Sequence, residues 1–106
     1  MSQRIAKVES LVRQTVAPLL VELMGKEGAL VTVTAVDVSP DLRHSSVWVG
    51  SVNDDEAVFE RVLEQRPELQ RQLASVMTTK FVPKISLRHD AGGRYADHIN
   101  RLLHDN

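Results

Sequence analysis

The chain has 106 residues, a net charge of −1 and no cysteine; 42% of its residues are apolar but only 4% are aromatic. This length predicts a single domain over residues 1–106, with a modest core of Val, Leu, Ile and Ala. The lack of cysteine excludes a disulfide framework, a thiolate metal site and a thiol nucleophile. No signal-peptide pattern occurs, and no stretch approaches the roughly 20 apolar residues of a membrane span. We therefore expect a cytoplasmic protein that does not associate with membranes.

Charge is unevenly distributed along the chain. Residues 1–21 carry three bases against one acid, residues 22–64 three bases against nine acids, and residues 65–106 seven bases against four acids. A near-neutral protein with separated charge can present a positive face to phosphate groups. The alternative is that the three segments intermix in the folded protein and their charges cancel.

Residues 4–24 are predicted to form an amphipathic helix. Pro18 lies inside the pattern and should kink the helix, and Gly25 and Gly28 are typical of its end. The apolar residues recur at spacings of three and four: Ile5, Val8, Leu11, Val12, Val16, Leu19, Leu20 and Leu23.

A β-hairpin is predicted next. Residues 29–39 and 43–52 are rich in β-branched side chains, which favours two strands. Between them, Pro40 occupies the second position of a turn over 39–42, where its restricted φ fits.

Two helices joined at a sharp kink are predicted over 54–79. Asn53 should cap the first helix, and Glu56 completes a capping-box spacing. Pro67 interrupts the apolar pattern and suits the first turn of a new helix, while Arg66 before it is disfavoured in the helical region.

The last strand is predicted over 84–89, where Ile85 and Leu87 alternate with polar residues. A break at 91–93 precedes a short C-terminal helix marked by Tyr95, Ile99, Leu102 and Leu103. The element order is therefore α-β-β-α-kink-α-β-α. This order predicts an α+β fold with two layers.

Several short motifs carry a family resemblance. They are VTVTAVDVSPDL at 31–42, VWV at 47–49, FVPKISLRHD at 81–90 and INRLL at 99–103. In their order and spacing the chain resembles ribosome-binding factor A over nearly its whole length. The resemblance implies a type II KH-like domain, with a three-stranded sheet packed by helices on one face.

The resemblance also implies a function. Such proteins bind the small (30S) ribosomal subunit and its 16S rRNA late in maturation and rRNA processing, and they are linked to growth in the cold. The RNA surface of the family lies around a kink of the Ala-x-Gly type. Here the corresponding residues are Gln65, Arg66 and Pro67. Pro67 keeps the break but removes a backbone N–H and bars close approach to a phosphate.

Basic residues are the candidates for RNA contact, because phosphate binding needs several Lys or Arg on one face. The alternative is that they are solvated surface charges, some of them paired with Glu64 or Glu68. The predicted RNA-binding residues are Arg4, Lys7, Arg66, Arg71, Lys80, Lys84, Arg88 and Arg94. Lys84 and Arg88 should share one strand face. Trp48 can stack on a base or pack in the fold, and packing is the favoured interpretation.

No catalytic set is recognisable, and we expect no enzyme activity, no metal, no cofactor and a monomer. The four histidines lack the spacing of a helical metal pair, and no nucleophile lies in a known motif. Two other functions stay open: a protein-interaction module that uses its sheet edge or the acidic helix at 54–64, and a small hydrolase or ligand-binding domain.

Overall fold

A long helix opens the chain in the computed structural model, which describes residues 3–93 and 95. This helix, α1, spans Gln3–Leu23 and continues through Pro18, which confirms the predicted helix. Its fully or nearly buried stripe consists of Val8, Val12, Val16 and Leu20. Because these residues are four apart, one face of the helix supplies apolar side chains to the core along its length.

A short 3₁₀ helix, η1 (Gly25–Leu30), links α1 to the sheet. The first strand, β1, spans Val31–Val38, so it begins later than the strand predicted from residue 29. A Cβ atom at Gly28 would lie 2.3 Å from the backbone oxygen of Val21. Only glycine therefore allows η1 to pack this closely against the end of α1. The N–H of Val31 donates to the oxygen of Gly28, and Val31 itself is the first extended residue.

The sheet has the order β1-β2-β3, with β2 (His44–Ser51) in the centre. Strand β2 pairs antiparallel with β1 and parallel with β3 (Lys84–His89). The backbone N–H of Ser39 donates to the oxygen of His44 (2.9 Å), which closes the predicted hairpin. A parallel β2–β3 pair requires a long crossover connection, and the two helices between these strands provide it.

The predicted pair of helices is confirmed as α2 (Glu56–Glu64) and α3 (Arg66–Val76), which meet at Gln65. Pro67 lies in the first turn of α3, where its missing N–H has no helical partner to lose. The expectation that Arg66 avoids the helical region was wrong. Its Nε donates to the backbone oxygen of Ile85 on β3 (2.8 Å), and this contact favours the helical conformation over the local preference.

The predicted cap of α2 needs correction. Asp55, not Asn53, caps the helix, because its carboxylate accepts hydrogen bonds from the backbone N–H groups of Ala57 (2.9 Å) and Val58 (3.3 Å). Asn53 lies inside a 3₁₀ turn, η2 (Val52–Asp54), with φ of 59°. Asn and Asp are about equally good caps, so the local pattern does not distinguish them, and the turn after β2 selects the later residue.

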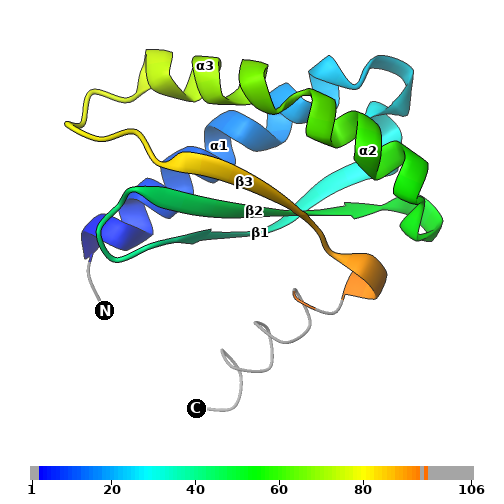
Figure 1. Ribbon diagram of the computed structural model, residues 1–106, viewed down its shortest axis with the longest axis horizontal. Helices are drawn as coiled ribbons and strands as arrows, with labels where there is room; N and C mark the ends of the chain where they lie inside the picture. Colours follow the sequence, from blue (N-terminus) through cyan, green and yellow to red (C-terminus); the bar gives the residue numbers. More distant parts are fainter. Residues whose placement is uncertain (1–2, 94, 96–106) are drawn as a thin grey trace.

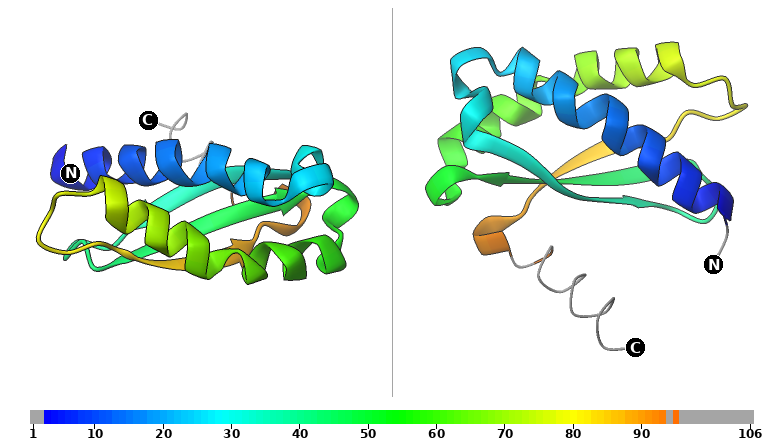
Figure 2. Two further views of the ribbon diagram at one scale, coloured as in Figure 1. Left: turned by 90° about the horizontal axis from the view of Figure 1, so that it is seen from above. Right: turned by 180° about the vertical axis from the view of Figure 1, so that it is seen from behind.

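The α-helices α1, α2 and α3 cover the same face of the sheet (Figures 1 and 2). The core lies between these two layers, and its fully buried side chains include Val12, Val16, Leu20, Val47, Val49, Val62, Leu69, Leu73 and Ile85. Over residues 3–93, the opposite face carries no α-helix. The expected α+β, type II KH-like architecture, with helices on one face of a three-stranded sheet, is confirmed.

Trp48 faces away from the helices. Its neighbours Val47 and Val49 are fully buried in the core, and alternation along β2 directs the indole to the opposite face. There Tyr95 stacks on it, with ring centroids 4.0 Å apart. Trp48 therefore has a packing role on this face, as expected. Apart from Tyr95, the predicted C-terminal helix lies outside the described residues.

Candidate nucleic-acid interface

The exposed face of β3 carries the first group of cations. Lys84 and Arg88 are exposed and lie on the face of the sheet opposite α1, α2 and α3, while Ile85 is buried on the other face. In the parallel register, Lys84 is paired with His44 and Arg88 with Trp48. The prediction that Lys84 and Arg88 share one strand face is therefore confirmed.

Arg88 is held in place by two contacts. Its Nε donates to Ser46 Oγ (3.2 Å), and its guanidinium carbon lies 5.8 Å from the centroid of the Trp48 ring. Neither contact neutralises its charge. Arg88 therefore remains available as a cation on a fixed position of the sheet.

Arg66 has a different position from the one predicted for an RNA contact. Its side chain is half-buried and its Nε bonds the backbone of β3 at Ile85. Gln70, one turn further along α3, donates to the backbone oxygen of Pro83 (3.0 Å) and accepts from the N–H of Ile85 (2.8 Å). Together the two side chains attach α3 to the outer edge of β3, so Arg66 contributes primarily to the position of the kink.

Side chains also cover part of the other sheet edge. The N–H of Val38 on β1 donates to a carboxylate oxygen of Glu9 on α1 (3.1 Å). Edge groups that are bonded in this way cannot pair with an added strand. At Val38 and Ile85, the sheet edges are therefore poor sites for strand addition by a protein partner.

Arg71 is paired within α3. It makes two hydrogen bonds with Glu68, at 2.9 Å and 2.5 Å, and Gln72 donates to the same carboxylate at 3.1 Å. These bonds hold the pKa of Glu68 at about 2, well below its usual value of 4.5. Because its charge is already paired with a carboxylate, Arg71 is a weaker candidate for phosphate contact than an unpaired cation.

We expect the Arg71→Gln variant to raise the pKa of Glu68 towards the ordinary value, because the guanidinium is the main cause of the shift. The folded-state pKa is lowered, so the stabilising contribution of Glu68 is present above the unfolded pKa and is lost as the pH falls from about 4.5 towards about 2. Carboxyl ¹³C NMR titration measures the change. Arg61→Gln is the control and should leave Glu68 unaffected. An unchanged Glu68 titration in Arg71→Gln would contradict this account.

A second group of cations lies where the turn between β1 and β2 meets the loop between α3 and β3. The guanidinium carbon of Arg43 lies 4.4 Å from the centroid of the Phe81 ring, and the Lys80 ammonium lies 5.4 Å from it. The N–H of Lys84 donates to the backbone oxygen of Arg43 (2.8 Å). We call Arg43, Lys80, Phe81 and Lys84 the basic tip.

Two members of the basic tip were missed in the sequence. Arg43 belongs to a segment with many acids, and Phe81 was counted only as part of the strand motif. The sequence pattern that could have indicated Phe81 as a binding residue is an aromatic side chain directly after Lys80 and shortly before Lys84. Their approach to Arg43 depends on the parallel pairing of β2 with β3, which no local pattern encodes.

The remaining predicted cations lie elsewhere. Arg4 and Lys7 are exposed in the first turns of α1. The start of α1 lies at the same end of the molecule as the β1–β2 turn and the α3–β3 loop (Figures 1 and 2). Arg4 and Lys7 are therefore placed near the end that carries the basic tip. Arg94 lies outside the described residues.

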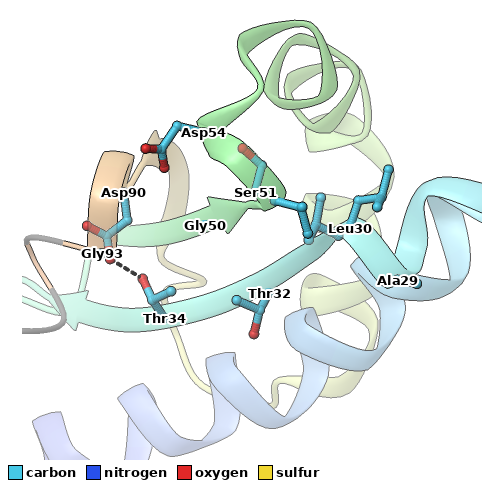
Figure 3. A pocket seen from close by; sticks show the side chains of 11 residues that line it. Ala29, Leu30, Thr32, Thr34, Gly50, Ser51, Asp54, Asp90 and Gly93 are labelled. Carbon is cyan, nitrogen blue, oxygen red and sulfur yellow. Dashed lines mark hydrogen bonds between the residues drawn. The ribbon is translucent and has the colours of Figure 1, made fainter.

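A shallow pocket of about 310 Å³ lies near the opposite end of the sheet (Figure 3). Asp90, which is almost fully buried, accepts hydrogen bonds from Thr34 Oγ1 (2.8 Å) and from the N–H of Tyr95 (2.8 Å). Asp54 accepts from the N–H of Gly92 (2.7 Å), in the short 3₁₀ turn η3 (Ala91–Gly93). Asp90 thus joins the segment after β3 to β1, and Asp54 joins the same segment to η2, which indicates a structural role for both carboxylates.

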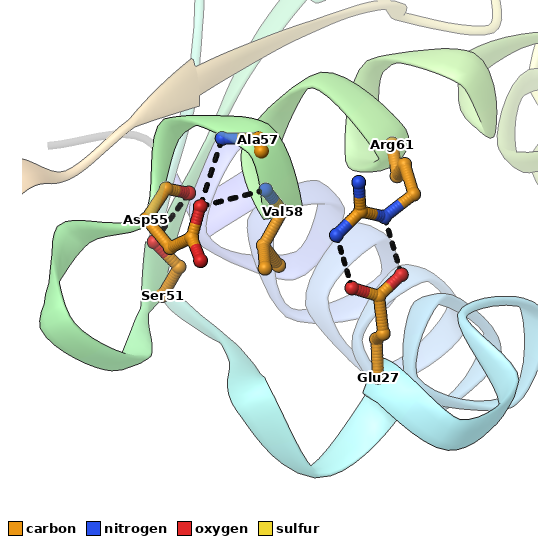
Figure 4. Close-up of polar contacts among 6 residues, drawn as sticks. All are labelled: Glu27, Ser51, Asp55, Ala57, Val58 and Arg61. Carbon is orange, nitrogen blue, oxygen red and sulfur yellow. Dashed lines mark hydrogen bonds and ion pairs between the residues drawn. The ribbon is translucent and has the colours of Figure 1, made fainter.

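Acidic residues gather around α2, at the end of the molecule away from the α3–β3 loop (Figure 1). Exposed carboxylates occur at Asp54, Asp55, Glu56, Glu60 and Glu64. The one cation of this helix, Arg61, is paired with Glu27 of η1 (Figure 4). The acidic helix α2 and the basic tip therefore occupy different ends of the fold. This separation agrees with the prediction that the protein presents a positive face.

Within residues 3–93 and 95, no cluster of three or more His, Asp or Glu side chains is arranged to hold a metal ion. No helix in the same residues is both long and apolar enough to cross a membrane.

Comparison with known proteins assigns the chain to a family. The family model described as Ribosome-binding factor A matches residues 4–103. The chain is 31% identical to the ribosome-binding factor A of Thermomicrobium roseum, over 96% of this chain and 82% of that protein. It is 33% identical to that of Rhodopseudomonas palustris, over 96% of this chain and 79% of that protein.

Solved structures agree on the fold. The crystal structure of ribosome-binding factor A from Thermus thermophilus has a TM-score of 0.70 at 22% identity and covers 80% of this chain and 93% of its own. Coordinates of the Thermus thermophilus protein fitted into the cryo-EM map of a 30S–RbfA complex have a TM-score of 0.60 at 19% identity, over 87% of this chain and 98% of theirs. Since the family match spans both the strands and the helices described above, the chain belongs to the ribosome-binding factor A family.

Proposed function

We propose that this protein binds the small ribosomal subunit during late maturation and rRNA processing, and that it contacts 16S rRNA as a monomer in the cytoplasm. Family membership carries the proposal, together with the complex of the Thermus thermophilus relative with the 30S subunit. The charge arrangement supports an RNA partner, because Lys80, Lys84 and Arg88 are exposed cations at or beside one strand.

The residues of the predicted RNA surface are not expected to contribute equally to binding. Arg66 and Arg71 are engaged with Ile85 and Glu68, so they contribute less than the cations of β3 and its preceding loop. Most of the binding energy is expected from phosphate contacts, which fix the orientation of the protein on the RNA without reading its sequence.

The test is co-sedimentation with isolated small ribosomal subunits across a salt series. The test variant combines Lys80→Glu, Lys84→Glu and Arg88→Glu and leaves Arg66 in place, because Arg66 joins α3 to β3. Binding by the natural protein should fall steeply with ionic strength, and the triple variant should lose at least roughly tenfold in affinity, as expected for several lost phosphate contacts.

The matched control is Glu56→Lys/Glu60→Lys/Glu64→Lys on α2, which changes the charge of the acidic end. It should retain binding. No binding of the natural protein at low salt would refute the proposal. Binding that is insensitive to salt and is lost only in the α2 variant would instead favour a protein-interaction module.

A further inference from the structure

The basic tip presents an exposed aromatic ring. The side chain of Phe81 is 42% exposed. Its backbone oxygen accepts a hydrogen bond from Thr79 Oγ1 (2.8 Å), and the following Pro83 is fully buried. Gln70 on α3 bonds the backbone oxygen of Pro83. The loop is therefore attached to α3 just after the ring, and Phe81 does not belong to the hydrophobic core.

Two cations of the basic tip lie over its aromatic ring. Arg43 and Lys80 both lie within cation–π distance of Phe81. Over the described part of the chain, ion pairs join Arg61 to Glu27 and Arg71 to Glu68, but none involves Arg43, Lys80 or Lys84. Two positive charges thus lie over one ring, and Lys84 adds a third at the start of the adjoining strand.

One acidic residue, Asp41, lies close to the tip. Its carboxylate accepts hydrogen bonds from Ser39 Oγ (2.7 Å) and from the backbone N–H of Arg43 (3.1 Å). The Ser39 hydroxyl and then the Arg43 N–H lower the pKa of Asp41, so it remains ionised. Its role is to fix the turn from which Arg43 projects, and the tip keeps an excess of positive charge.

This combination matches the chemistry of single-stranded RNA. Phosphates are satisfied by Lys and Arg, and a base stacks on an aromatic ring whatever its sequence. Duplex RNA offers phosphates but keeps its bases stacked on each other, so it cannot use the ring. One exposed ring is too small an apolar patch to suggest a hydrophobic protein interface.

We propose that the basic tip is a contact site for a single-stranded segment of RNA, in which Phe81 stacks on a base and Arg43, Lys80 and Lys84 contact the adjacent phosphates. The inference rests on the proposed function and adds to it a specific part of the surface and the type of RNA that it takes. Phe81 and Arg43 then act as binding residues in addition to the cations of β3.

The experiment compares Phe81→Leu and Arg43→Gln with the natural protein. Affinities are measured for a fluorescein-labelled single-stranded uridine decamer, for a duplex of the same length and for isolated small ribosomal subunits. Phe59→Leu is the matched control for the ring, because Phe59 stacks on His89 within the fold (ring centroids 4.7 Å apart). Arg61→Gln is the matched control for the charge, because Arg61 is paired with Glu27 and lies on the acidic helix α2. Circular dichroism checks that all variants are folded.

Phe81→Leu should weaken binding to the single strand and to the subunit roughly tenfold and leave duplex binding unchanged, because only the stacked base is lost. Arg43→Gln should weaken binding to both RNAs and lower the salt dependence by about one phosphate contact. The two controls should bind like the natural protein.

The failures of the two proposals can be told apart. If the natural protein binds the subunit but Phe81→Leu and Arg43→Gln bind it equally well, the tip is not a contact site and the proposed function stands. If Arg43→Gln loses affinity but Phe81→Leu does not, the contact is purely electrostatic and base stacking is refuted. If the natural protein does not bind the subunit at low salt, the proposed function fails first, and the inference fails with it.

Discussion

Replacing Leu69 by alanine should lower the free energy of unfolding by about 3 kcal/mol, within the range measured for buried Leu→Ala changes. Leu69 is fully buried in the core, just beyond the break between α2 and α3. Its backbone N–H donates to the oxygen of Gln65 (3.0 Å), so it also belongs to the first turn that re-forms the helix. A cavity at this position removes the packing that holds α3 against the sheet.

Urea unfolding followed by circular dichroism measures this effect. Leu63→Ala is the matched control, because Leu63 lies on α2 on the other side of the junction and is 43% exposed. A surface change of this kind should alter stability by only about 0.5 kcal/mol. Equal destabilisation in the two variants would contradict the position of Leu69 in the core.

Replacing Asp90 by alanine should also destabilise the fold strongly, by about 3 kcal/mol, because buried hydrogen bonds to a charged group each contribute about 1.5–3 kcal/mol. The carboxylate, with 2% of the residue exposed, joins Thr34 on β1 to the N–H of Tyr95. Its loss removes the anchor that places Tyr95 on Trp48. The emission of Trp48 should therefore shift to longer wavelength, since more of the indole meets water.

Thermal unfolding and the emission spectrum of Trp48 measure the two consequences together. Asp54→Ala is the matched control, because Asp54 also accepts a backbone hydrogen bond, from Gly92, but is exposed. Asp54→Ala should destabilise the fold less than Asp90→Ala and leave the emission of Trp48 unchanged. If Asp90→Ala left that emission unchanged, Asp90 would not be what holds Tyr95 in place.

Much of the fold follows from local patterns. The four-residue spacing of Val8, Val12, Val16 and Leu20 determines which face of α1 enters the core, whatever it packs against. Alternation has the same effect in β3, where Ile85 is buried and its neighbours Lys84 and Ser86 are exposed. The interruption at Pro67 is equally local, because proline lacks the N–H that would continue the helix.

Local patterns were less successful at the ends of elements. The sequence between β2 and α2 offers Asn53 and Asp55, two residues of similar capping strength, and the turn after β2 determines which is used. The beginning of β1 follows η1, in which Gly28 lies so close to the backbone of Val21 that no Cβ atom fits. Such boundaries depend on packing against another element.

The sequence by itself determined the family, the order of the α-helices and strands through β3, and the pool of basic residues from which an RNA surface can be built. It could not assign these cations to their partners, because ion pairs and side-chain bonds to a distant backbone depend on which elements meet. Only the tertiary structure places Arg66 against Ile85, 19 residues away, and Arg43 over Phe81. The parallel pairing of β2 with β3 brings the last pair together, because it aligns the start of both strands at one end of the sheet.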